Sequence, residues 1–249
     1  MSYIDFHTHL HAYPDPERCL EGLNRLEALA VACSVDVASY LATLQLAEQS
    51  SRIIPTFGIH PSRADQYVDT LDDLLPLVQA SGIIGEIGLD RTWWKDIPAS
   101  QQEKVFAWFL DQSVQQDKYC VIHTKGAEKR VLEMLRHHQV EKAVIHWYHG
   151  PSWIFRRLLD RGYYQSFGCE LRYSAAVRRL LRLTPAELIL AETDNPDSEK
   201  WLGGSQDGPD LIIRVIRDIA AAKRIKPELA RLLTVGNAMK IIQHRPAVG

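Results

Sequence analysis

Ile84-Gly85-Glu86-Ile87-Gly88-Leu89-Asp90 is the stretch that decides the predicted fold. It is an apolar run of the kind that forms a buried parallel strand, and it carries one carboxylate, Glu86, among its isoleucines. A buried carboxylate costs free energy unless another group pairs with it. We infer that the partner is a metal ion, because other apolar runs of this chain also end on side chains that bind metals.

Three of those other runs end on histidine and one ends on aspartate. They are Ile4-Asp5-Phe6-His7-Thr8-His9, Cys120-Val121-Ile122-His123, Ala143-Val144-Ile145-His146 and Leu188-Ile189-Leu190-Ala191-Glu192-Thr193-Asp194. In a barrel of parallel strands, the carboxyl ends of the strands meet at one face, where active sites are built. The sequence therefore predicts one site to which several strands contribute.

Short apolar runs alternate with amphipathic stretches along the whole chain. The strand candidates are Tyr3–His7, Leu29–Cys33, Ile53–Gly58, Ile83–Gly88, Cys120–His123, Ala143–His146, Tyr164–Gly168 and Leu188–Glu192, each followed by a helical pattern. Eight such units in 249 residues are typical of an α/β fold of the (β/α)8 TIM-barrel type, and we expect one such domain over residues 1–249. An open doubly wound sheet normally has a Gly-rich loop after its first strand, where this chain has His-Thr-His-Leu-His.

Sequence signals also predict where several helices begin and end. Thr70-Leu71-Asp72-Asp73 and Ser100-Gln101-Gln102-Glu103 are capping patterns, so we expect a helix to begin at each. A long helix is predicted over Leu211–Lys223 after Pro209, and a short terminal one over Pro227–Leu233.

Composition restricts the class of protein. With 46% hydrophobic and 24% charged residues, the chain is that of an ordinary globular protein. It shows neither a signal peptide nor a membrane span, so we expect a cytoplasmic protein without a membrane partner. The four cysteines are far apart and form no C-x-x-C pair, which predicts reduced, packed thiols.

Charge is distributed unevenly along the chain. Residues 1–124 hold 8 Lys and Arg against 17 Asp and Glu, whereas residues 125–249 hold 21 against 14. The densest basic part contains Arg156, Arg157, Arg161, Arg172, Arg178, Arg179 and Arg182. Such asymmetry suggests a polyanionic ligand, and the alternative is that these arginines are only the solvated faces of surface helices.

The candidate ligands predict a site for two cations. His7 and His9 are one residue apart, so on an extended backbone both side chains point the same way. Glu86 can bridge two cations through its two oxygens, with His123 and His146 holding the second. Asp194 would complete the shell of the first cation and accept a proton from the attacking water. The alternatives are a salt bridge from Glu86 to Lys125, an N-cap role for Asp194, and core histidines that are satisfied by hydrogen bonds.

The motifs together resemble the TatD family of metal-dependent deoxyribonucleases along nearly the whole chain. They are Asp5-Phe6-His7-Thr8-His9-Leu10, Phe57-Gly58-Ile59-His60-Pro61, Gly85-Glu86-Ile87-Gly88-Leu89-Asp90, Val121-Ile122-His123-Thr124-Lys125-Gly126-Ala127, His146-Trp147-Tyr148-His149-Gly150, Glu192-Thr193-Asp194 and Gly236-Asn237. The resemblance implies a barrel with two divalent ions. His7, His9, Glu86 and Asp194 would surround one ion, and Glu86, His123 and His146 the other. The implied reaction is hydrolysis of DNA phosphodiesters, often as a 3′→5′ exonuclease on single strands or 3′ ends.

The chain departs from the family pattern on the substrate side. Thr124-Lys125 stands where the family commonly has Ser-Arg, His-Trp-Tyr-His-Gly replaces His-Cys-Phe-Ser-Gly, and Asn195-Pro196-Asp197 replaces Ser-Pro-Tyr. These changes leave the proposed ligands in place and alter the expected substrate contacts. We expect those contacts from His60, Lys125, His149, Arg172 and Trp147, with Trp93, Trp94 and Tyr148 as further candidates for stacking on bases.

The expected mechanism is two-metal hydrolysis with Asp194 and Glu86 as the catalytic carboxylates and with Mg²⁺, Mn²⁺ or Zn²⁺ as the ions. Two other functions remain open. One is a small-molecule hydrolase of the amidohydrolase or phosphatase kind, which also begins with H-x-H. The other is a binding subunit, and TatD-like proteins do occur in multi-gene bacterial defence cassettes, which would supply partner proteins.

Overall fold

Parallel strands form the centre of the fold in the computed structural model, which describes residues 2–205 and 208–244. The outer residues of the predicted domain, 1 and 245–249, lie outside this part. Within it, eight strands follow one another in chain order: β1 (Tyr3–Thr8), β2 (Ala28–Cys33), β3 (Ile53–Thr56), β4 (Ile84–Gly88), β5 (Cys120–His123), β6 (Ala143–Ile145), β7 (Tyr164–Phe167) and β8 (Ile189–Ala191). Neighbouring strands pair in parallel in the orders β1-β2-β3 and β4-β5-β6-β7-β8.

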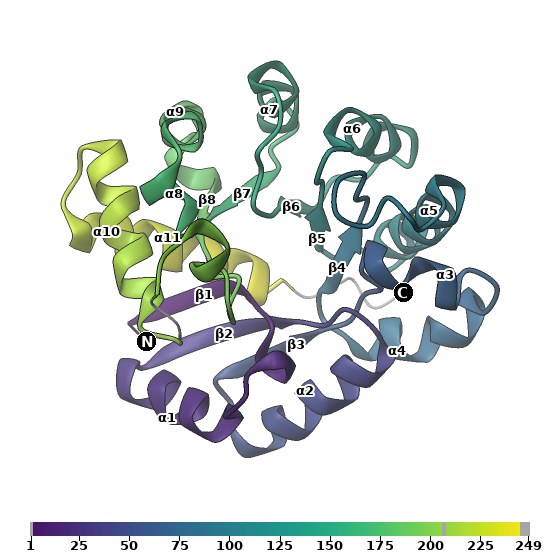
Figure 1. The fold of residues 1–249 in the computed structure, drawn as a ribbon, viewed down its shortest axis with the longest axis horizontal. Helices are drawn as coiled ribbons and strands as arrows, with labels where there is room; N and C mark the ends of the chain where they lie inside the picture. The colour runs from purple at the N-terminus through teal and green to yellow at the C-terminus, as the bar shows by residue number, and fades with distance from the viewer. Residues whose placement is uncertain (1, 206–207, 245–249) are drawn as a thin grey trace.

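Backbone hydrogen bonds join the two sets of strands at both edges. At one edge, the amide of Gly85 in β4 donates to the carbonyl oxygen of Phe57, at 2.9 Å. At the other, the amide of Asp194, just after β8, donates to the carbonyl oxygen of His7 in β1, at 2.8 Å. Figure 1 shows the helices on the outside of the resulting ring of strands. The fold is the predicted (β/α)8 barrel.

The helices follow the strands as expected. In the described residues they are α1 (Pro16–Leu26), α2 (Val37–Gln49), α3 (Ala64–Tyr67), α4 (Leu75–Ala80), α5 (Ala99–Gln115), α6 (Glu128–His137), α7 (Ser152–Leu159), α8 (Glu170–Tyr173), α9 (Ala175–Leu183), α10 (Leu211–Lys223) and α11 (Pro227–Ile242). Short 3-10 turns, η1 (Leu10–Ala12), η2 (Pro61–Arg63), η3 (Leu71–Leu74), η4 (Ala186–Leu188) and η5 (Lys200–Leu202), lie between them.

Two predicted helix boundaries are wrong, and a third, at Thr70, is in place without its predicted capping bond. Thr70 precedes the 3-10 turn η3 and makes no side-chain capping bond. α5 begins at Ala99 with Pro98 in the N-cap position, so Ser100 lies inside the first turn instead of capping it. α11 continues to Ile242, well beyond Leu233, because Ala238 and Ile241 pack against the barrel interior. Asn237 also ties α11 to β8, since its amide donates to the carbonyl oxygen of Ile189 at 2.9 Å.

Two of the three clusters of the apolar core position the site. Side chains such as Ile4, Phe6, Val121 and Leu190 fill the barrel interior, and a larger cluster lies between strands and helices. The four cysteines are buried and free, as predicted. Because apolar side chains fill the barrel interior, the polar side chains at the strand ends lie above it, at the carboxyl face of the barrel. No helix in the described residues is long and apolar enough to span a membrane.

Glu170, at the start of α8, is expected to make folding stability depend on pH. Its side chain is buried, and burial, with a further contribution from the charge of Glu192, raises its pKa from 4.5 to about 8. The stability contributed by the protonated carboxyl is therefore fully present below pH 4.5 and lost as the pH rises through about 8. Urea unfolding between pH 5 and 9 should show a loss of a few kcal/mol that Glu170→Gln removes. The exposed Glu187→Gln control should keep the parent profile, and an unchanged profile in Glu170→Gln would contradict this account.

Candidate metal centre

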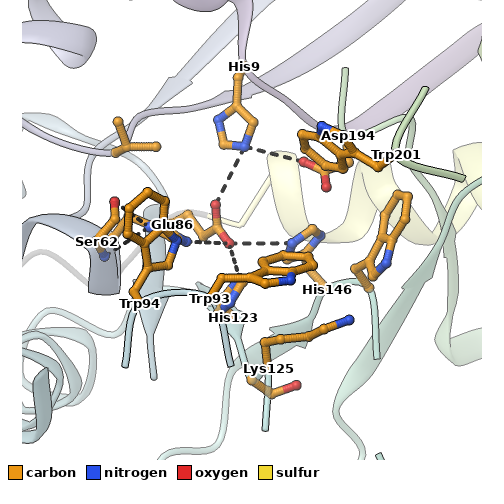
Figure 2. Close-up of a pocket in the computed structure, with 14 residues that line it drawn as sticks. His9, Ser62, Glu86, Trp93, Trp94, His123, Lys125, His146, Asp194 and Trp201 are labelled. Carbon is orange, nitrogen blue, oxygen red and sulfur yellow. Dashed lines mark hydrogen bonds and ion pairs between the residues drawn. The ribbon is translucent and has the colours of Figure 1, made fainter. Parts of the chain in front are cut away.

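A cavity of about 580 Å³ opens at the carboxyl ends of the strands (Figure 2). Its floor carries His9, Glu86, His123, His146 and Asp194, which follow or end five different strands. All five lie at this face because each ends an apolar run that becomes a barrel strand. The structure thus brings together the ligands that the sequence predicts.

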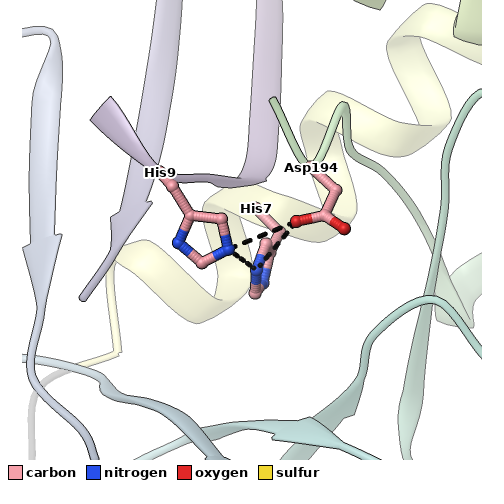
Figure 3. A group of neighbouring side chains, drawn as sticks. All are labelled: His7, His9 and Asp194. Carbon is pink, nitrogen blue, oxygen red and sulfur yellow. Dashed lines mark hydrogen bonds and ion pairs between the residues drawn. The ribbon is translucent and has the colours of Figure 1, made fainter. Parts of the chain in front are cut away.

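Four donor atoms converge on one point at the base of the cavity, and Figure 3 shows three of the residues that supply them, His7, His9 and Asp194. Nε2 of His7 lies 3.3 Å from Nε2 of His9, 3.4 Å from Oε2 of Glu86 and 3.5 Å from Oδ1 of Asp194. Nε2 of His9 lies 3.6 Å from the same Glu86 oxygen and 3.3 Å from the same Asp194 oxygen. Donor atoms around one tetrahedral zinc ion at about 2.1 Å are themselves about 3.4 Å apart. The spacing of these four atoms therefore fits a single cation.

The second oxygen of Glu86 faces a separate set of imidazoles. Oε1 lies 2.9 Å from Nδ1 of His123, 3.4 Å from Nε2 of His146 and 3.8 Å from Nε2 of His60. His123 and His146 are the predicted ligands of a second cation. His60 joins them, although the sequence suggests only a substrate contact for it. Burial lowers the pKa of His60 to about 3, so its ring is neutral. Its Nδ1 accepts the amide of Ser62 at 3.1 Å, so the ring proton lies on Nε2, which faces Glu86.

Glu86 occupies the centre of both groups because its backbone is held tightly between strands. Its amide donates to the carbonyl oxygen of Ser34 at 3.0 Å. A Cβ atom at Gly58 would lie 2.7 Å from the Glu86 carbonyl oxygen, so glycine is needed for this close approach. Burial alone would raise the pKa of Glu86, but His60, His7 and His146 hold it well below its usual range. Glu86 is therefore a carboxylate, and the predicted alternative of a salt bridge to Lys125 is not formed.

Each histidine among the candidate ligands but one is oriented by a hydrogen bond at its other ring nitrogen. Nδ1 of His9 lies 2.9 Å from the carbonyl oxygen of Cys33, and Nε2 of His123 lies 2.9 Å from Oδ2 of Asp90. Nδ1 of His146 lies 3.2 Å from both oxygens of Glu192. Such partners fix the ring and raise the basicity of a metal-binding imidazole. His7 is the exception, since its buried Nδ1 has no partner among the described residues.

Asp90 connects this centre to the loop after β4. While Oδ2 contacts His123, Oδ1 accepts the amides of Thr92 and Trp93, each at 2.7 Å. Burial opposes ionisation, yet the bonds with His123 and these amides lower the pKa of Asp90 to about 2. One carboxylate thus fixes both a candidate ligand and the backbone of the loop that carries Trp93 and Trp94.

Glu192 connects the centre to the loop after β6. It accepts the amide of Trp147 at 3.1 Å and the hydroxyl of Ser166 in addition to His146. Trp147 has a φ of 45°, a strained value for a bulky residue, and the bond from its amide helps to hold it there. The sequence places Asp90 and Glu192 in motifs without assigning them a role. The signal for such a role in the sequence is that both are acidic residues placed just after a buried strand.

Glu192→Gln is expected to weaken metal binding without removing a ligand. The neutral side chain of Gln lacks the negative charge with which Glu192 accepts the hydrogen bond from His146. The imidazole ring of His146 is therefore held less firmly and becomes less basic. Loss of such a partner typically costs about 10–100-fold in metal affinity. Chelator competition would measure the change, with the exposed Glu187→Gln as the matched control. Equal affinities in the two variants would exclude an orienting role for Glu192.

The predicted substrate contacts divide into two groups. His60, Lys125 and Trp147 line the cavity, together with Trp93, Trp94 and Trp201. Nζ of Lys125 lies 4.6 Å from the ring centre of Trp93. The ring of Trp201 lies 6.4 Å from those of both Trp93 and Trp147, so indoles from three loops surround the opening.

His149 and Arg172 do not line the cavity. His149 stacks outside it on Trp147, with ring centres 6.4 Å apart. Arg172 forms an ion pair with Asp218 of α10 at 3.3 Å, so the structure does not bring it near the centre. Because Arg172 comes just after β7, sequence order predicts a place for it near the candidate metals. Its position in the short helix α8 does not bring it there.

Comparison with known proteins gives a family match and several similar sequences and structures. A family profile described as "TatD related DNase" matches residues 4–243. An "Uncharacterized metal-dependent hydrolase TatD" of Mycobacterium tuberculosis is 28% identical, over 95% of this chain and 96% of its own. The human "Deoxyribonuclease TATDN3" is 26% identical, over 96% and 93%. The crystal structure of YJJV, a TatD homologue from Escherichia coli K12, superposes with a TM-score of 0.86 at 20% identity, covering 98% of this chain and 99% of that one.

Proposed function

Because the chain belongs to the family of TatD-related DNases, we propose that it removes nucleotides from single-stranded DNA ends in the 3′→5′ direction, with two divalent cations at Glu86. The chain is a metal-dependent hydrolase of this family. The observation that carries the proposal is the position of Glu86, because its two carboxylate oxygens face separate sets of nitrogen and oxygen donors. One bridging carboxylate between two donor sets is the arrangement of two-metal phosphodiester hydrolases.

The residues of the two donor sets fit the proposed cations. His7, His9, Glu86 and Asp194 would hold one, and Glu86, His123 and His146 the other, with His60 beside the second. The mixed set of imidazoles and carboxylates suits Zn²⁺ or Mn²⁺ and tolerates Mg²⁺. When bound, the cations supply Lewis-acid stabilisation of the phosphate charge and a lowered pKa for the attacking water.

The chain's own side chains position the substrate and move the proton. Oδ1 of Asp194 faces His7 and His9, whereas Oδ2 accepts no hydrogen bond within the described residues. Oδ2 is therefore available to orient the attacking water and to take its proton. Lys125 lies at the cavity wall, where its ammonium can neutralise a phosphate oxygen as a point charge.

The indoles around the opening favour an unpaired strand end as the substrate. A base can stack on Trp93, Trp147 or Trp201 only when it has left a duplex, and such stacking contributes about 1–3 kcal/mol per base. The same cavity holds the candidate metal ligands, so a base stacked on one of these rings lies in the cavity that would receive the scissile phosphate. A single strand that enters by its end can place its bases in this way.

Metal analysis followed by digestion assays tests the proposal. The purified protein, loaded with Mg²⁺, Mn²⁺ or Zn²⁺, is incubated with 5′-labelled single- and double-stranded DNA and RNA. We expect stepwise shortening of single-stranded DNA from the 3′ end, and about two equivalents of metal per chain. Hydrolysis of a small ester without cleavage of any nucleic acid would instead support a small-molecule hydrolase. The role as a subunit of a defence assembly stays a prediction.

A further inference from the structure

A second hollow, of about 650 Å³, lies on the outside of the barrel between α7 and α9. Arg156 of α7 and Arg179 and Arg182 of α9 line it, with Ser152, Ser174 and His149 at its end nearest the cavity. We call it the arginine groove. The two helices are neighbours along the rim of the barrel in Figure 1, and neither carries a ligand of the metal centre.

The three arginines of the groove differ from the other arginines of the basic region because their side chains have no partner in the part of the chain that the structure describes. Among those others, Arg157 pairs with Asp160, Arg172 pairs with Asp218, and Arg161 donates to the hydroxyl of Tyr163. Arg178 donates to the carbonyl oxygen of Leu171.

Arg156, Arg179 and Arg182 are exposed, and they make no hydrogen bond or ion pair within the described residues. Of the seven arginines of the basic region, the three without a partner in the described residues therefore all line one groove, and this grouping argues against the reading of the basic region as mere solvated surface.

The inner end of the groove adjoins the catalytic cavity. His149 lines the groove, and its ring stacks on that of Trp147 with an angle of 12° between the planes. Trp147 in turn lines the cavity. A chain that leaves the cavity past Trp147 therefore reaches His149 and then the arginines.

The outer end of the groove continues into a further hollow that shares Arg156 and Leu183 with it. Trp153 lines this further hollow, not the arginine groove, and is 55% exposed, so its indole can stack on a base. Arg179 and Arg182 are three residues apart and share one face of α9. The nine residues of α9 rise by about 13 Å, which is longer than one nucleotide. The ligand that matches this surface is an extended polyanion with exposed bases.

We propose that the arginine groove binds the phosphate backbone of a single-stranded nucleic acid whose end lies in the catalytic cavity. This inference rests on the proposed function, because it assigns the path of the uncleaved part of the substrate. Guanidinium groups bind phosphates bidentately and release counterions when they do so. The groove therefore supplies affinity for long substrates and no chemistry at the scissile bond.

The test is a triple variant, Arg156→Gln, Arg179→Gln and Arg182→Gln, in the metal-loaded full chain. For a single-stranded 20-mer, KM should rise about tenfold or more, and the slope of log K against log salt should weaken by about 2, or about 0.7 per lost phosphate contact. Both DNA and RNA 20-mers should show this change in binding, since the contacts are to the backbone. The kcat/KM for a chromogenic phosphodiester should stay within about twofold, because the arginines lie outside the cavity.

A matched control replaces three other exposed arginines, Arg18, Arg136 and Arg217, by glutamine. Its net charge equals that of the groove variant, so it should show only the smaller, general effect of lost charge. If the groove variant and this control bind the 20-mer alike, the groove proposal is overturned, and equal losses on the chromogenic ester overturn it as well. If the parent protein neither binds nor cleaves any nucleic acid, it is the proposed function that fails.

Discussion

Glu86→Gln is expected to lower kcat/KM on single-stranded DNA by at least about 10³-fold, since each 1.4 kcal/mol of lost stabilisation costs a factor of ten. Its two oxygens face different donor sets, so the substitution removes the shared negative charge from both at once. The amide also presents N–H donors to imidazole nitrogens that should hold cations. Steady-state kinetics and metal analysis by mass spectrometry would measure the two losses together.

The matched control for this variant is Glu48→Gln, an exposed carboxylate on α2. It should retain parent activity and metal content. Thermal unfolding of the metal-free proteins shows whether Glu86→Gln keeps the fold. A folded Glu86→Gln protein with full activity and unchanged metal content would exclude the bridging role.

Asp194→Asn should reduce kcat on single-stranded DNA by about 10²–10⁴-fold while one donor set stays intact. Asn keeps the shape of the side chain but cannot take a proton from water. His123, His146 and Glu86 do not depend on Asp194, so about one equivalent of metal should remain bound. The comparison of kcat with metal content therefore separates loss of the base from loss of the whole centre.

Asp160→Asn, an exposed substitution at the end of α7, controls for the change from Asp to Asn. It should leave kcat and metal content unchanged. Parent-like turnover in Asp194→Asn would assign Asp194 a structural role, such as closing the barrel through its backbone amide.

Much of the fold and of the candidate centre is predictable from the sequence because strand ends are fixed by short-range patterns. An apolar run that ends on His123 or His146 specifies both the strand and the place of its last side chain. The barrel then places Glu86 among the histidines, since parallel strands deliver their carboxyl ends to one face.

The features that sequence reasoning missed depend on contacts between distant segments. The orienting role of Glu192 requires that β7, with Ser166, and the loop after β6, with Trp147, lie beside it. The length of α11 depends on packing against the barrel interior, which the local sequence does not show. The predicted start of α5 is wrong for a local reason. Pro98, whose φ is fixed by its ring, occupies the N-cap position, so the helix begins at Ala99.

Arg172 shows the limit of arguments from sequence order. Its position after β7 places it close to the centre along the chain, yet Asp218 draws its side chain toward α10. Which arginines remain available for a ligand depends on which acidic side chains the fold brings to the others. That information lies in the pairing of α8 with α10 and is absent from the local sequence.

The hydrogen bond from Asp194 to His7 joins the last strand to the first, and the same two residues supply two of the four donors of the first set. During synthesis on the ribosome, the amino-terminal residues His7 and His9 emerge long before Asp194. A nascent chain therefore carries only part of this donor set until residue 194 has been translated and β8 has closed against β1. Premature termination anywhere before that point yields a fragment that lacks the proposed proton acceptor.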